Sequence, residues 1–260
     1  MSGAADWPTE QIRQAIAPEL PGFHVEVLAR IDSSNSELMR RARSGPAECV
    51  LLVAEQQTAG RGRLGRHWAG GEETGSSLSF SLGLPLSPRD WSGLSLAAGL
   101  SIVQSLHPEL RLKWPNDVWW QGRKLAGILI ETASVGADRY VVVGVGINIR
   151  KRDGTGFATA PAWLEELLPD MDAPRALLRI AAPLVRAIKM FEIRGFAPFQ
   201  AAFNERDALY GVDVALSDGT AGIAHGVDGI GALQLKTALG LKSISSAEIS
   251  VRPAPSSAAR

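Results

Sequence analysis

The sequence has little of what marks secreted, membrane-bound or nucleic-acid-binding proteins. It contains one cysteine, Cys49, so no disulfide bond can form within the chain, and a reducing compartment fits. Its 27 basic residues equal its 27 acidic residues, whereas dedicated nucleic-acid-binding proteins usually carry a clear positive excess. Residues 1–7 have neither the basic start nor the apolar segment of a signal peptide. These absences predict a cytoplasmic protein.

Long apolar segments of the kind that cross membranes are also missing. Residues 91–107 carry no Asp, Glu, Lys or Arg, but the segment is short for a span and contains several serines and Gln104. A buried helix is therefore the better interpretation, and we expect no membrane association. A chain of 260 residues, 45% of them hydrophobic, can bury the core of one large domain and of a small second one.

The spacing of apolar residues predicts helices, strands and hairpins over residues 1–208. Thr9 is the expected N-cap of the first helix, and Gly45 ends the second. Residues 77–82 alternate polar and apolar side chains, which predicts a half-buried strand. Hairpins mixed with helices predict an α+β domain with a mixed or antiparallel sheet. The expected helices cover residues 9–20, 36–43, 92–106 and 173–193, and the expected strands cover 24–31, 48–56, 77–82, 110–114, 117–121, 123–132 and 140–149.

The pattern changes near residue 209. Beyond it, short apolar stretches are separated by Asp218-Gly219, Asp228-Gly229 and Gly240, and no helical periodicity is present. Asp-Gly between apolar stretches is a strong hairpin signal. We therefore predict a main domain over residues 1–208, a small β-barrel over 209–253, and a disordered tail over 254–260.

Residues 60–66, here called the glycine–arginine loop, contain three arginines interleaved with three glycines after an apolar strand. Arginine offers planar donors to phosphate or carboxylate, and glycine lets the backbone approach a ligand, so the loop predicts an anion site. The loop satisfies the dinucleotide fingerprint G-x-G-x-x-G, but residues 68–75 after it are a poor helix, so that interpretation fails. A P-loop also fails, because Arg66-His67 replaces the lysine and the hydroxyl residue. A surface turn rich in arginine is the weaker alternative.

Four other segments carry polar residues that suit a ligand. Lys113–Asp117 and Gly122–Gly127 bring two lysines and an asparagine to a hairpin, although an ordinary turn with solvated lysines would look similar. Gly144–Asn148 places glycines within an apolar strand, which marks close approach either of a ligand or of a packed helix. Ser33–Asn35 follows a strand, and Ser34 with Glu37 fits a capping box as well as a ligand contact.

Together these segments resemble the biotin protein ligase family, the ligases that biotinylate carboxyl carrier proteins. The matching motifs keep their order and spacing from about residue 24 to residue 252, and the glycine–arginine loop combined with the two lysine segments is highly specific. The resemblance implies a class II synthetase-like (biotin–lipoate ligase) catalytic domain followed by an SH3-like barrel. The motifs are Asp32–Asn35, Gln57–Arg63, Lys113–Asp117, Gly122–Leu129, Gly144–Asn148, Gly226–Leu233 and Glu248–Arg252.

The resemblance implies a reaction in two steps. Biotin and ATP form biotinyl-5'-AMP and pyrophosphate, and a lysine of a biotin carboxyl carrier protein then takes the biotinyl group and releases AMP. By this match the catalytic residues are Lys124, Arg63 and Lys113. We add Asp117 as a catalytic residue on the hypothesis that it either orients Lys124 or accepts a proton from the incoming lysine. The biotin-binding residues are Ser33, Ser34, Asn35, Gln57, Gly60, Arg61, Lys124, Gly144 and Gly146. The nucleotide-binding residues are Arg61, Arg63, Arg66, Trp68, Lys113, Asn116, Asn148 and Arg252.

The resemblance also sets expectations about cofactors and partners. Mg²⁺ is expected with ATP, but no residue is identified as its ligand. About 23 residues precede the first strand, too few for the DNA-binding module of some relatives, so no DNA binding is expected, and a homodimer is left open. Ser34 replaces the usual threonine, and Ala247 replaces a common glycine. We expect activity to survive both changes.

Three other functions compete with this one. A lipoate or octanoate ligase shares the catalytic fold, but Gln57 with the two serines favours a ureido ring over an aliphatic dithiolane. A non-catalytic biotin or adenylate sensor would not need the full set of lysines and arginines. An RNA-binding protein is disfavoured by the balanced charge and by the lack of aromatic stacking motifs.

Overall fold

The computed structural model describes residues 6–45, 48–71, 73–135, 138–151, 159–245 and 251–254. The substitution at Ala247 and the predicted disordered tail, apart from Ala254, lie outside the described residues. Within the described part of the chain, no helix is long and apolar enough to cross a membrane.

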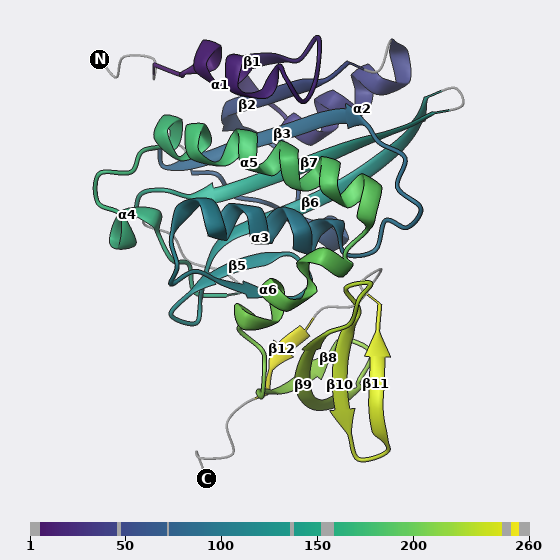
Figure 1. Cartoon of the computed structure of the whole chain (residues 1–260). Coiled ribbons are helices and arrows are strands. Elements are labelled where there is room, and N and C mark those ends of the chain that lie inside the picture. The colour runs from purple at the N-terminus through teal and green to yellow at the C-terminus, as the bar shows by residue number, and fades with distance from the viewer. Residues whose placement is uncertain are drawn as a thin grey trace.

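A seven-stranded mixed sheet forms the centre of the molecule, as predicted (Figure 1). Its first two strands run parallel, and all its other neighbouring strands run antiparallel. In spatial order the strands are β1 (His24–Ile31), β2 (Val50–Gln57), β3 (Ser77–Pro85), β7 (Asp138–Asn148), β6 (Arg123–Val135), β5 (Asp117–Trp120) and β4 (Arg111–Lys113).

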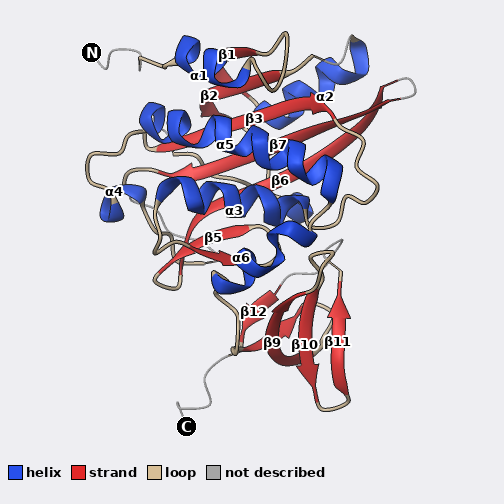
Figure 2. Ribbon diagram, in the orientation of Figure 1, coloured by secondary structure: helices blue, strands red, loops and turns tan. Residues whose placement is uncertain are grey.

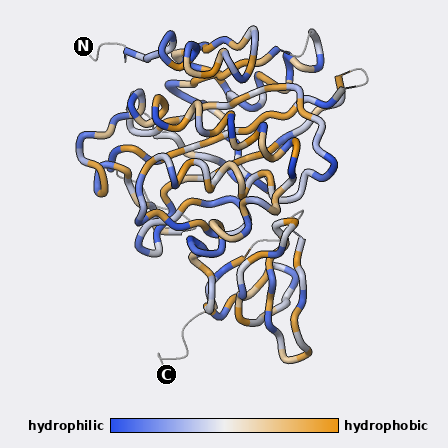
Figure 3. The backbone as a smooth tube through the Cα atoms, viewed as in Figure 1, coloured by the Kyte–Doolittle hydropathy of each residue, from blue (hydrophilic) through white to orange (hydrophobic). Residues whose placement is uncertain are grey.

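The two long helices α3 (Leu94–Leu106) and α5 (Ala173–Arg194) pack side by side over one face of this sheet (Figure 2). The large apolar side chains of β3 and β7 point toward these helices and form the main core, and Figure 3 shows apolar stretches along the central strands. Helix α2 (Ser34–Ser44) packs on the opposite face, where Leu38 contacts a smaller cluster around Leu52 and Val142. The remaining short helices are α1 (Thr9–Ile16), α4 (Leu164–Leu167), α6 (Gln200–Glu205) and two 3-10 turns at Arg63–Gly65 and Ala197–Phe199.

A second, antiparallel sheet of five strands follows α6, in agreement with the predicted small β-domain (Figure 1). Its contacts with the rest of the chain include a hydrogen bond from Trp114 Nε1 to the carbonyl of Gly231 at 3.1 Å. The side chains of Gln200 and Asn204, on α6, also bond the backbone of Val227. Its spatial order is β11 (Gly240–Ile244), β10 (Leu233–Thr237), β9 (Ala221–Val227), β8 (Asp213–Leu216) and β12 (Val251–Pro253).

Three local predictions were wrong in detail. The first helix ends at Ile16 and is preceded by Pro8 rather than capped by Thr9. The N-cap of α2 is Ser33, whose hydroxyl accepts from the Ser36 amide, so Ser34 is already helical. Strand β3 is buried on both faces up to Leu84. Its serine-bearing face is covered by protein, since Ser81 contacts Ser34 and Asn35 at the start of α2.

Candidate active site

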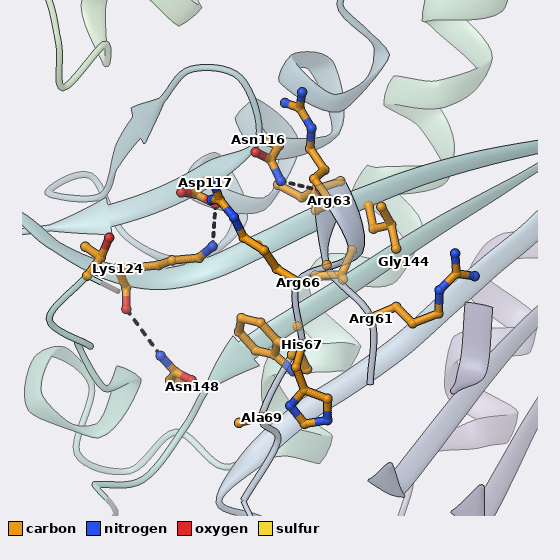
Figure 4. A pocket seen from close by; sticks show the side chains of 18 of the residues that line it. Arg61, Arg63, Arg66, His67, Ala69, Asn116, Asp117, Lys124, Gly144 and Asn148 are labelled. Carbon is orange, nitrogen blue, oxygen red and sulfur yellow. Dashed lines mark hydrogen bonds and ion pairs between the residues drawn. The ribbon is translucent and has the colours of Figure 1, made fainter. Parts of the chain in front are cut away.

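A cavity of about 1520 Å³ lies where the glycine–arginine loop and the start of α2 meet the sheet (Figure 4). The structure brings nearly all of the predicted site residues together around it. Gly60 is the exception: its carbonyl accepts from the Trp68 amide at 2.9 Å, so it shapes the base of the loop without lining the cavity. The lining residues are Ser33, Ser34, Asn35, Gln57, Arg61, Arg63, Arg66, Trp68, Lys113, Asn116, Asp117, Lys124, Gly144, Gly146, Asn148 and Arg252, among others.

Two glycines of β7 make room for side chains that cross the sheet. A Cβ at Gly144 would overlap the side-chain amide of Asn35, and a Cβ at Gly146 would overlap the indole of Trp68. These glycines lie opposite Ser81 and Ser79 of β3, on the face away from the main core. The glycines in the apolar strand therefore mark close approach by neighbouring side chains, which then form the wall of the cavity.

The end of the cavity near α2 is neutral and polar. The backbone amide and the hydroxyl of Ser34 both donate to Gln57 Oε1, at 2.8 and 3.1 Å, which sets the orientation of the Gln57 amide. The hydroxyl of Ser81, fully buried, lies 2.7 Å from Ser34 Oγ and 2.6 Å from Asn35 Oδ1. We call Gln57, Ser34, Ser81 and Asn35 the polar pocket. Buried groups of this kind suit a neutral ligand with its own donors and acceptors.

Sequence reasoning missed Ser81 and Glu131. The Nδ2 of Asn35 donates to Glu131 Oε2 at 3.0 Å, and Arg61 Nη1 lies 2.9 Å from Glu131 Oε1. Both residues had a signal in the sequence. Ser81 belongs to the alternating serines of β3, and Glu131 is a carboxylate within an otherwise apolar part of β6.

The opposite end of the cavity is cationic. Asp117 forms an ion pair with Lys124, whose Nζ lies 2.6 Å from Oδ1 (Figure 4). Lys113 Nζ lies 3.9 Å from the other carboxylate oxygen. In the same view Arg66 points toward Asp117 and Arg61 points away from it, so the arginines of the loop serve different ends of the cavity. Lys113, Lys124, Arg63, Arg66 and Arg252 outnumber Asp117 and Glu73, the acidic side chains among the described lining residues.

Burial increases the electrostatic effect of two of these cations, Lys113 and Arg63. It is the main cause that lowers the pKa of Lys113; Asp117 acts in the opposite direction, and Lys124 adds to the lowering. Burial likewise lowers the pKa of Arg63, although a guanidinium remains charged at neutral pH. Because charges interact more strongly away from water, this end of the cavity is suited to a polyanion such as a triphosphate.

A β-bulge places Lys124 in the site. Gly127 pairs with Asp117 and Ala126 with Val118, but the next partner of β5 is Lys124, so Leu125 is an extra residue on β6. In a regular strand Lys124 would point to the face opposite Gly127. The bulge instead buries Leu125 in the main core and turns Lys124 toward Asp117 on the cavity side.

The side chains of the two asparagines expected near the adenine donate hydrogen bonds to backbone carbonyls. Asn116 Nδ2 donates to the carbonyl of Ile128 at 2.8 Å, and Asn148 Nδ2 donates to the carbonyls of Lys124 and Ala162, each at 3.2 Å. Trp68 lies over Gly146 with Lys124 Nζ 6.0 Å from the centre of its ring. Its Nε1 is buried beside Gly146 and has no hydrogen-bond partner among the described residues.

A polar pocket and a cationic end within one cavity, on a mixed sheet joined to a small second sheet, define a ligase of the biotin/lipoate class. Two family models match the chain: the Biotin/lipoate A/B protein ligase family over residues 27–148, and the Biotin protein ligase C terminal domain over residues 211–252. The chain belongs to the Biotin/lipoate A/B protein ligase family.

Relatives and solved structures agree with this assignment. The chain is 35% identical to the bifunctional ligase/repressor BirA of Escherichia coli K12, covering 92% of this chain and 77% of that protein. It is 38% identical to the biotin–[acetyl-CoA-carboxylase] ligase of Mycobacterium tuberculosis, covering 81% and 82%. The structure of biotin protein ligase from Aquifex aeolicus in complex with biotin and ATP matches with a TM-score of 0.76 and 30% identity, over 88% of this chain and 99% of that one.

Proposed function

We propose that this protein is a biotin protein ligase that joins biotin to a lysine of a biotin carboxyl carrier protein through biotinyl-5'-AMP. The observation that carries the proposal is the arrangement of the cavity. Ser34 and Gln57 form a neutral polar pocket at one end, and Lys113 and Lys124 flank Asp117 at the other. A molecule with a ureido head and a carboxylate tail fits between these ends, with its carboxylate toward the cations.

In the first step the biotin carboxylate attacks the α-phosphate of ATP. A new bond forms between the carboxylate oxygen and phosphorus, and pyrophosphate leaves with the electrons of the broken P–O bond. Both reactants are anions, so cations must offset their repulsion and hold them in line. We assign Lys124 and Arg63 to the carboxylate and α-phosphate, and Lys113 to the departing phosphates. Asp117 orients Lys124 through their 2.6 Å ion pair.

In the second step the amine of a carrier lysine attacks the acyl carbon of biotinyl-AMP. An amide bond forms, the acyl–phosphate bond breaks, and AMP leaves. Water is the competing nucleophile, because it would return biotin and AMP without product. The glycine–arginine loop and Trp68 line the cavity, and we propose that they close over the mixed anhydride and exclude water.

The protein's own donors do not fit a magnesium cage. Within the described ranges, no group of three or more His, Cys, Asp or Glu side chains is arranged to hold a metal ion. Among the lining carboxylates, Asp117 is already held by Lys124. We propose that Mg²⁺ enters bound to the triphosphate, as is usual for this ion, and we assign no step to it. We further propose that residues 1–208 form the catalytic domain and residues 209–253 the barrel.

The exchange of labelled pyrophosphate into ATP tests the first step directly. We expect exchange that depends on biotin, and we expect Lys124→Ala and Arg63→Ala to reduce it to background. Lys242→Ala is the matched control, because Lys242 is exposed on β11 and bonds Thr220 far from the cavity. Folded protein that shows no exchange with biotin would remove the proposal. Exchange supported by lipoate and not by biotin would assign the rival ligase activity.

A further inference from the structure

Glu131 lies behind the wall of the cavity. It projects from β6 on the same face as Gly127 and Leu129, opposite Val142, and its side chain is 19% exposed. It is not among the residues that line the cavity. A carboxylate in this position has no direct contact with a ligand, so its role must be sought in the groups that it holds.

The carboxylate of Glu131 contacts two different parts of the site. Nη1 of Arg61, in the glycine–arginine loop, lies 2.9 Å from Oε1 and 3.3 Å from Oε2. Oε2 accepts from Nδ2 of Asn35, in the first turn of α2, at 3.0 Å. Through Asn35 the same carboxylate is joined to Ser81 and hence to Ser34. Glu131 is therefore the junction between the loop and the polar pocket.

The loop transmits the position of Arg61 to its other arginines. Arg61 and His67 form an antiparallel bridge, the Trp68 amide donates to the Gly60 carbonyl, and the Gly62 amide donates to the Arg66 carbonyl at 2.7 Å. These bonds make the loop a small closed hairpin. An anchor at Arg61 consequently sets where the rest of the hairpin lies over the cavity.

We propose that Glu131 is a positioning residue that anchors the glycine–arginine loop through Arg61 and links it to the polar pocket through Asn35. This inference rests on the proposed function, because it assigns to the loop the task of covering biotinyl-AMP.

The variant Glu131→Gln tests the anchor while keeping the size of the side chain. The measurement is the amount of AMP released by hydrolysis for each carrier molecule biotinylated, with biotin and ATP saturating. We expect this ratio to rise about fivefold, because the loop loses its ion pair and admits water more often. Glu26→Gln is the matched control. Glu26 lies on the edge strand β1, away from the cavity, and one of its carboxylate oxygens is 2.9 Å from Arg41 Nη1. We expect this variant to leave the ratio unchanged.

A double-variant cycle separates positioning through Arg61 from a general structural effect. If Glu131 acts through Arg61, then Glu131→Gln adds nothing to the ratio measured in an Arg61→Gln background. Additive effects, or a ratio unchanged by Glu131→Gln in protein with wild-type thermal stability, would overturn the inference. If the Glu131→Gln variant does not fold, Glu131→Asp replaces it, because aspartate keeps the charge on a shorter side chain. The same outcomes then support or overturn the inference. Failure of the proposed function is distinct, because wild-type protein would then show no biotin-dependent exchange.

Discussion

Replacing Gly144 by alanine tests how tightly the polar pocket is packed. A Cβ at this position would lie 2.0 Å from Oδ1 and 2.7 Å from Cγ of Asn35, so either Asn35 or the strand must move. Asn35 is held by Ser81 at 2.6 Å and by Glu131 at 3.0 Å, and it cannot move far without losing both bonds. A neutral hydrogen bond contributes about 1 kcal/mol and one to a charged group about 2 kcal/mol, so we expect a loss of about 3 kcal/mol.

Thermal unfolding and biotin binding both report this loss. For a chain of this size, 3 kcal/mol corresponds to a decrease in Tm of about 6–12 °C. Biotin affinity, measured by calorimetry, should fall at least about tenfold, because Asn35 leaves the pocket. Gly45→Ala is the control: Gly45 has extended backbone, and its Cβ would meet only the Arg41 carbonyl at ordinary contact distance.

The result that would refute this reasoning is specific. With Asn35→Ala already present, the overlap is gone, so Gly144→Ala should cost little more. If Gly144→Ala costs the same in both backgrounds, then the cost does not come from Asn35. A variant that keeps wild-type Tm and biotin affinity would show that the strand yields easily and that close packing at Gly144 has no energetic role.

Three further outcomes are expected. Asp117→Asn should lower the rates of both half-reactions about tenfold, because the ion pair that orients Lys124 is lost; unchanged rates would exclude this role. Ser81→Ala should raise the KM for biotin about fivefold and leave the KM for ATP unchanged. Ser101→Ala is the control, because Ser101 lies in the core on α3. Equal shifts in both KM values would contradict a specific role of Ser81 at the biotin end. Burial raises the pKa of Asp207 to about 6, so its charged form opposes folding, and the free energy of unfolding should fall as pH rises from 4 to 6. In urea unfolding, Asp207→Asn should remove this pH dependence. An unchanged pH dependence in the variant would show that it does not come from Asp207.

Much of the fold follows from local patterns. The apolar run of β7, the amphipathic spacing of α5 and the Asp-Gly turns after residue 209 predicted a mixed sheet, a long covering helix and a second small β-domain. Element ends were less well predicted, because caps depend on side-chain contacts such as the bond from the Ser36 amide to Ser33. The alternating serines of β3 led to the wrong prediction of a half-buried strand, for a related reason. Alternation shows which face is polar, but whether water or protein covers that face depends on segments distant in sequence.

The sequence by itself determined the chemistry of the site: which side chains carry charge, where glycine frees the backbone, and which motifs occur in order. Those properties belong to individual residues and to their spacing. Only the tertiary structure decided what each residue faces. The extra residue Leu125 turns Lys124 toward Asp117, and strands far apart in the chain bring Ser81 and Glu131 beneath Asn35. Arg61 and Arg66 lie five residues apart in one loop, yet the first is bound to Glu131 and the second points toward Asp117. Such pairings depend on strand register and on long-range contacts, which no local pattern contains.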